Sequence, residues 1–268
     1  MNSLEGLLRN ALLAAARSAR LKALALRLPV TAAVVRRFVP GETIAECLAA
    51  VRALAADGLH ASIDFLGEDT TSPAQAAAVR DGYLEVLARL SAEGLTGTAE
   101  VSVKLTALGL GLPDGRGLAL AHAREICAAA SAAGTTVTVD MEDHTATDAT
   151  LGVLAELRRD YPDAGGVLQA YLHRTLDDCT LLAGEKSRIR LCKGAYAEPA
   201  EVAHQTREEV STAYVACARV LMAGDGFPML ATHDPEMIAA VAELAAQYGR
   251  EPGSYEFQML YGIRSDEQ

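Results

Sequence analysis

Eight polar side chains lie near the C-terminal ends of short strand-like segments spread along this chain. A lysine or arginine in such a place can pair with a carboxylate or stabilise developing negative charge. Polar groups that converge from the ends of many strands form the active site of a (β/α)8 barrel. The pattern therefore predicts an active site built from Asp64, Lys104, Asp140, Gln169, Arg190, Lys193, His233 and Gln258.

Seven strand-like segments carry these residues, and helical patterns separate them. The strand-like segments span 60–69, 101–109, 136–143, 166–174, 188–196, 229–234 and 255–264. The helical segments span 41–58, 72–94, 117–134, 148–165, 199–224 and 234–249. This alternation indicates parallel strands joined by helical crossovers. We therefore predict an α/β fold, a distorted (β/α)8 TIM-type barrel, whose eighth strand and helix are missing from this chain.

Polar and apolar residues alternate within the predicted strands. The polar positions include Ser102, Lys104 and Thr106 in one strand, and Arg188, Arg190 and Cys192 in another. Alternation gives each strand one apolar and one polar face. In a barrel the apolar faces should meet the helices, so the polar faces should line the lumen and contact a ligand. The alternative is a solvent-exposed face of an antiparallel sheet, which the helical crossovers argue against.

Composition narrows the class of protein. The chain has 268 residues, half of them hydrophobic, which suits one barrel with a large core. Its formal net charge of −11 argues against a nucleic-acid partner bound through bulk charge. The five cysteines form no CxxC pair, which argues against a disulfide framework or a thiolate zinc site and favours a reducing cytoplasm. No apolar run reaches the roughly 18 residues of a membrane span.

The chain is predicted to be a single domain over residues 1–268, with an N-terminal helical region at 1–37 and barrel units one to seven at 38–268. The N-terminal region is apolar but is interrupted by Arg9, Arg17 and Arg20. This pattern is typical of an amphipathic helix and not of a signal peptide. We expect the helix to cap the barrel or pack on its outside; a membrane-surface helix is the alternative.

Several motifs resemble those of a known family. The segments VSVKLTALG, TVTVDMED, LQAYL, RLCKGAY, LATHD and YEFQMLYGIR, in this order, are similar to the flavin-dependent proline dehydrogenases. HASIDFLGED resembles the first strand and loop of the single-function bacterial members. The resemblance implies a distorted (β/α)8 barrel that holds FAD at the strand C-termini. It also implies oxidation of L-proline to 1-pyrroline-5-carboxylate and transfer of electrons to a quinone, by a cytoplasmic protein that meets the inner face of the membrane.

The same resemblance implies roles for individual residues. It places a substrate-binding lysine at Lys104 and the catalytic pair at Asp140 and Arg190, where Asp140 would orient Arg190 or Lys104. Lys104 can pair with an amino-acid carboxylate, and Arg190 can stabilise the negative charge of a flavin that receives hydride. Flavin contacts are implied at Met141, Gln169, Lys193, Gly194, Ala195, Thr232 and His233.

The resemblance also implies elements beyond the last residue of this chain. YEFQMLYGIR is the seventh strand of the family, and the helix after the eighth strand carries two arginines that clamp the proline carboxylate. The chain stops at Gln268, before those positions. The sequence therefore suggests a C-terminally truncated member of the family, and a truncated, inactive flavin-binding relative is an alternative.

Two other enzyme classes fit parts of the pattern. A Schiff-base aldolase on the same barrel could use Lys104 or Lys193 as its nucleophile. A metal-dependent barrel could use the acidic run Asp140, Glu142, Asp143 and His144, although ligands from other strands are sparse. GLGLPDGRG at 109–117 lacks the spacing of a dinucleotide-binding loop and is predicted to be a plain loop.

Overall fold

A computed structural model of the protein describes residues 38–65 and 70–268. The N-terminal helical region predicted at 1–37 and the end of the segment 60–69 lie outside the described residues. The chain divides into two compact units, Met1–Cys47 with Leu260–Gln268, and Leu48–Met259. All seven strands belong to the second unit.

The described part of the first unit contains local hydrogen bonds. The carboxylate of Glu46 accepts from the backbone N–H of Glu42 (3.0 Å) and of Thr43 (3.1 Å). These bonds satisfy donors at the start of α4 (Ile44–Ala56), which continues into the second unit. At the other end of the chain, the Gln268 side-chain amide donates to the backbone oxygen of Leu260 at 3.1 Å.

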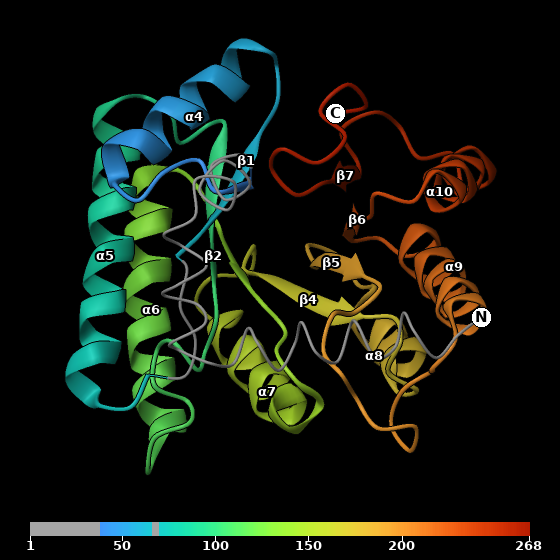
Figure 1. Cartoon of the computed structure of the whole chain (residues 1–268), viewed down its shortest axis with the longest axis horizontal. Helices are drawn as coiled ribbons and strands as arrows, with labels where there is room; N and C mark the ends of the chain where they lie inside the picture. Colours follow the sequence, from blue (N-terminus) through green and yellow to red (C-terminus); the bar gives the residue numbers. More distant parts are fainter. Residues whose placement is uncertain (1–37, 66–69) are drawn as a thin grey trace, which may run out of the picture. The chain divides into compact units, whose positions relative to one another are not determined.

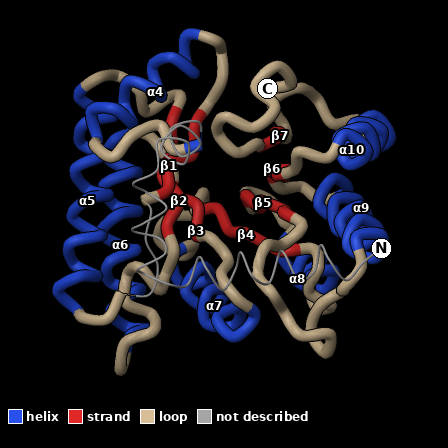
Figure 2. The backbone as a smooth tube through the Cα atoms, in the orientation of Figure 1, coloured by secondary structure: helices blue, strands red, loops and turns tan. Residues whose placement is uncertain are grey.

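One parallel sheet organises the second unit. Its strands are β1 (Ala61–Asp64), β2 (Ala99–Val103), β3 (Val137–Val139), β4 (Gly165–Gln169), β5 (Arg188–Cys192), β6 (Phe227–Ala231) and β7 (Glu256–Gln258). The strands lie in sequence order, and every neighbouring pair is parallel. The sheet curls from β1 to β7 as a partial barrel (Figure 2). The seven-stranded barrel prediction is confirmed, and the described residues form no eighth strand.

Helices follow the strands and cover the outer side of the curled sheet (Figure 1). They are α5 (Pro73–Ala92), α6 (Gly115–Ala133), η1 (His144–Ala146), α7 (Thr147–Leu157), α8 (Thr175–Leu182), α9 (Arg207–Ala223) and α10 (Pro235–Gln247). Side chains cap several of them: Ser72 accepts from the Gln75 N–H at the start of α5. No helix in the described part of the chain is long and apolar enough to cross a membrane.

One helix was missed, and several predicted helices differ in extent from those in the structure. Helix α8 was missed because its eight residues give too little periodicity to distinguish it from the end of the preceding segment. The helix expected at 199–224 begins only at Arg207, because Thr206 and Glu209 form a capping box there. The helix expected at 148–165 ends at Leu157, and the loop at 109–117 already enters α6 at Gly115.

The apolar strand faces meet the helices, as the alternation predicts. Buried side chains of β4, β5 and β6 pack with α8, α9 and α10 in one cluster, which includes Leu168, Leu191, Leu230, Cys179, Tyr214, Leu221 and Val241. Burying such side chains contributes roughly 1.5–3 kcal/mol each. This outer layer supplies the hydrophobic stabilisation and leaves the inner strand faces to polar residues.

Arg250, which follows α10, caps the C-terminal end of α9. Its guanidinium donates to the backbone oxygens of Met222 (2.9 Å), Leu221 (3.1 Å), Gly226 (3.0 Å) and Gly224. The last carbonyls of a helix have no partner within the helix, and a cation there also complements the helix dipole. One side chain thus holds α9 and the start of β6 in place.

Candidate active site

Arg190 lies at the centre of the polar inner face. From β5 it donates to Asp140 Oδ1 after β3 at 2.8 Å, and to Gln258 Oε1 of β7 at 2.6 Å. Its Nη atoms also donate to Ser62 of β1 (2.8 Å) and Ser102 of β2 (2.9 Å). The Arg190 guanidinium therefore contacts residues that lie on, or directly after, four other strands around the lumen. The pairing predicted between Asp140 and Arg190 is present.

Lys104 forms a second ion pair on the same face, with Asp64. Tyr83 of α5 supports the pair, because its hydroxyl lies 3.4 Å from Asp64 Oδ1 and donates to the Ser102 backbone oxygen at 2.7 Å. Burial raises the pKa of Asp64, although Lys104 pulls it downward. Lys104 is thus paired with Asp64, and Asp140 is paired with Arg190.

A buried amide lies at the end of β4. Gln169 is buried, and its Nε2 donates to the backbone oxygen of Glu142 at 2.7 Å. The Glu142 carboxylate in turn accepts from the backbone N–H of Thr106 (3.0 Å) and from its hydroxyl. Met141, one of the predicted flavin contacts, is buried and directly precedes Glu142 in the sequence. These bonds tie the loops after β2, β3 and β4 together.

Lys193 joins two helix N-termini. It follows β5, and its Nζ donates to Asp234 Oδ2 (2.8 Å) at the start of α10 and to Ser211 Oγ (3.0 Å) in α9. Arg207, the first residue of α9, also reaches Asp234 Oδ2 at 3.3 Å. Two cations beside two helix N-termini make a place suited to an anionic group. Sequence reasoning missed Asp234, although it ends the quoted LATHD motif.

Four other predicted flavin contacts lie in the segments that carry Lys193 and Asp234. Gly194 has φ of 113°, and a Cβ there would come within 2.4 Å of the Tyr171 ring, so this position requires glycine. Ala195 follows in an exposed loop position. Thr232 is buried after β6, where its hydroxyl accepts from the Asp234 N–H at 3.1 Å, and His233 lies between these two residues.

We expect Asp234→Asn to lower stability at neutral pH by about 1 kcal/mol, since asparagine keeps the cap but loses the charge interactions. The Lys193 ammonium holds the pKa of Asp234 below its ordinary value. A lowered folded-state pKa contributes stability above the unfolded-state pKa, and this contribution disappears as the pH falls through the folded value. Urea unfolding of both proteins should therefore differ at pH 7 and converge toward pH 3. A difference that is constant across this range would contradict the assignment.

The acidic run proposed for a metal is divided among separate partners. Asp140 pairs with Arg190, Asp143 accepts from the Thr145 N–H (2.9 Å), and His144 contacts Glu198. Across residues 38–65 and 70–268 there is no group of three metal-binding side chains. Lys104 and Lys193, the two candidate Schiff-base lysines, each form an ion pair with an aspartate. No contact favours either alternative chemistry.

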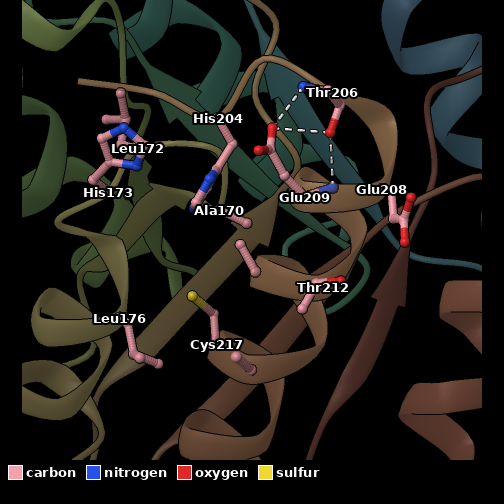
Figure 3. Close-up of a pocket in the computed structure, with 12 residues that line it drawn as sticks. Ala170, Leu172, His173, Leu176, His204, Thr206, Glu208, Glu209, Thr212 and Cys217 are labelled. Carbon is pink, nitrogen blue, oxygen red and sulfur yellow. Dashed lines mark hydrogen bonds between the residues drawn. The ribbon is translucent and has the colours of Figure 1, made fainter. Parts of the chain in front are cut away.

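A cavity of about 530 Å³ lies apart from these residues, between α8 and α9 (Figure 3). Its lining includes Leu172, Leu176 and Cys217. His173 and His204 also line it, with ring centroids 4.5 Å apart. None of the sequence-predicted site residues lines this cavity, so we do not identify it with the active site.

Sequence reasoning missed a partly buried carboxylate beside Arg190. Glu100 of β2 lies 3.4 Å from Arg190 Nη2 and accepts from Arg188 Nη2 at 2.9 Å. Glu100 lies two residues before Ser102. Because side chains in a strand alternate between faces, Glu100 lies on the same polar face as Ser102. Ser62 shares that face with Asp64 in the same way.

A curled parallel sheet with ion pairs at the C-terminal ends of its strands defines an α/β-barrel enzyme. Comparisons with known proteins identify the family. The family model described as proline dehydrogenase matches residues 47–267. Proline dehydrogenase 1 of Bacillus subtilis is 35% identical over 233 residues, which cover 87% of this chain and 76% of that protein. Proline dehydrogenase of Deinococcus radiodurans is 37% identical over 235 residues, covering 87% and 75%.

Solved structures share the fold. Proline utilization A (PutA) from Bdellovibrio bacteriovorus, inactivated by N-propargylglycine, superposes with a TM-score of 0.80 at 24% identity. The match covers 91% of this chain and 30% of that longer protein. A variant of PutA from Bradyrhizobium japonicum gives a TM-score of 0.68 at 25% identity and covers 84% of this chain and 26% of that one.

The chain belongs to the proline dehydrogenase family. This membership confirms the resemblance seen in the motifs, including its single-function bacterial type. Membership in this family identifies the protein as an oxidoreductase that acts on proline in the first step of proline catabolism. It also implies a cofactor of the flavin type.

Proposed function

We propose that this protein oxidises L-proline to 1-pyrroline-5-carboxylate with noncovalently bound FAD as the hydride acceptor. The observation that carries the proposal is the central position of Arg190, held by Asp140 and Gln258 at the C-terminal side of the sheet. In the reaction, proline loses a hydride from C5 and a proton from its nitrogen, so that a C=N bond forms.

The residues present fit a flavin dinucleotide. The adjacent strands β4 and β5 carry hydrogen-bond donors, an amide from Gln169 at the end of β4 and a guanidinium from Arg190 in the middle of β5. Lys193 and Arg207 lie at the N-termini of α9 and α10, which suits the phosphates. We assign Met141, Gly194, Ala195, Thr232 and His233 to the same cofactor site.

Each charged residue has one role in this proposal. A bound flavin would accept the hydride, and the Arg190 guanidinium would stabilise the negative charge that arises on it. Asp140 holds the Arg190 guanidinium in place through the 2.8 Å bond. Lys104 binds the proline carboxylate, for which it must share its ammonium with Asp64, its present partner.

The electron acceptor and the place of action complete the proposal. We infer that electrons pass from the reduced cofactor to a quinone, in a cytoplasmic protein that meets the inner face of the membrane. These assignments rest on the family and on the motifs quoted above.

The absorption spectrum of the purified protein tests the proposal. After incubation with excess FAD and removal of free cofactor, the protein should show a flavin spectrum that bleaches when L-proline is added without oxygen. Gln169→Ala and Lys193→Ala should each weaken FAD binding, whereas Leu181→Ala, at a side chain 81% exposed on α8, should not. A colourless protein, or a bound flavin that proline leaves oxidised, would refute the assignment.

A further inference from the structure

Glu100 is a carboxylate in the lumen whose two oxygens face different groups. Oε1 lies 3.4 Å from Arg190 Nη2 and accepts from Thr138 Oγ1 at 2.9 Å. Oε2 accepts from Arg188 Nη2 at 2.9 Å and from Thr136 Oγ1 at 2.8 Å. Only 12% of the Glu100 side chain is exposed. The carboxylate therefore connects Arg190, the arginine of the active site, to Arg188, which lies two residues earlier on the same strand.

The contact crosses the lumen. Glu100 lies on β2 and both arginines lie on β5, and these strands are not neighbours in the sheet. Arg188 is fixed on its other side, because its guanidinium lies 5.0 Å from the centre of the Phe227 ring of β6. Its exposed fraction is 22%, and that of Arg190 is 13%. Charged groups that are largely withdrawn from water in this way require partners.

The charges in this cluster cancel. Asp140 and Glu100 both lie against Arg190, so these three groups alone carry one net negative charge. Arg188 adds the fourth charge and brings the sum to zero. Without Arg188, the carboxylates around Arg190 would outweigh its positive charge at the position where a substrate or cofactor develops negative charge.

We propose that Glu100 and Arg188 are positioning residues that hold Arg190 in place and set the electrostatic potential at the active site. This inference rests on the proposed function, because it assumes that flavin binds beside Arg190. Glu100 restrains Nη2 of the guanidinium, while Nε donates to Gln258. Arg188 neutralises Glu100, so that Arg190 keeps its charge available for the reaction.

The reduction potential of bound flavin tests this proposal. Glu100→Gln leaves one excess positive charge and should raise the potential, whereas Arg188→Met leaves one excess negative charge and should lower it. A unit charge about 10 Å from a redox centre changes its equilibrium by roughly tenfold at an effective dielectric constant near 20, which is about 30 mV for two electrons. We expect shifts of this size and of opposite sign.

The double variant Glu100→Gln/Arg188→Met should return to the parental potential, because both charges are gone. Arg116→Met removes a positive charge from a half-exposed side chain of α6 that pairs with Glu156 of α7, and should leave the potential unchanged. A purely structural role predicts shifts without a fixed sign and no recovery in the double variant. Shifts of the same sign, or a double variant displaced as far as a single one, would overturn the proposal.

Two further outcomes remain decisive. If a single variant does not fold, the double variant must fold and keep the parental potential; failure of either condition overturns the proposal. If the parent binds no flavin, the proposed function fails, and urea unfolding of the flavin-free single and double variants decides the inference. Coupling of at least tenfold in the unfolding equilibrium constant would support the pair, and additive effects would refute it.

Discussion

Arg190→Met is expected to slow the reduction of bound flavin by L-proline by about 10²-fold or more, or roughly 3 kcal/mol, by analogy with the loss of one oxyanion donor. Methionine fills a similar volume but donates no hydrogen bond to Asp140, Gln258 or the two serines. The chemical step therefore loses its nearest fixed positive charge. Rapid mixing of proline with the oxidised, flavin-loaded protein measures the rate directly.

Arg190→Lys is the matched comparison. Lysine keeps the charge but lacks the planar fork that reaches several acceptors at once, so we expect a rate between those of the parent and Arg190→Met. Flavin content should be matched before the rates are compared, since Asp140 loses its ion-pair partner and Glu100 loses one of its two arginines in the methionine variant. An Arg190→Met protein that is reduced at the parental rate would show that Arg190 has no role in the hydride transfer.

Arg250→Met is expected to destabilise the protein by about 3 kcal/mol without involving the active site. The substitution leaves four backbone oxygens at and after the end of α9 without their donor. Hydrogen bonds that involve a charged group are worth about 1.5–3 kcal/mol each, and their effects at one site are not additive. Since a typical domain is stable by about 5–15 kcal/mol, the loss should be evident in urea unfolding.

Arg89→Met provides the control for this change. Arg89 has a side chain 48% exposed and pairs with Glu93 on the surface of α5, and such pairs are worth about 0–1 kcal/mol. The two variants lose the same side chain, so the difference between them isolates the cap at α9. Equal stabilities for Arg250→Met and Arg89→Met would mean that water replaces the Arg250 hydrogen bonds without cost.

The residues on the inner and outer faces of the barrel could be predicted from the sequence, because side chains in a strand alternate between its two faces with a period of two. The same period placed Asp140 and Arg190 on the inner face, whereas their pairing was implied only by the resemblance to the family. Helix ends were harder to predict. The start of α9 depends on the Thr206 and Glu209 capping box, which competes with a helix pattern that begins earlier.

Contacts across the lumen could not be predicted in the same way. Whether Glu100 lies level with Arg188 or with Arg190 depends on strand tilt and stagger, which no local pattern specifies. The choice of Asp64 as the partner of Lys104 likewise depends on the register between β1 and β2. The cluster at Lys193 and Asp234 was missed because its residues come from a loop and two helix starts.

The ion pairs inside the barrel also constrain how the chain folds. Arg190 meets Ser62 across 128 residues of sequence and Gln258 across 68, and Glu100 meets Arg188 across 88. Contacts so distant in sequence form slowly, since long loops must close first. A sheet assembled without β5 would hold the Glu100 carboxylate against the lumen without either arginine, which is unfavourable. Partly assembled sheets are therefore penalised, and we expect the seven strands to come together in one cooperative transition.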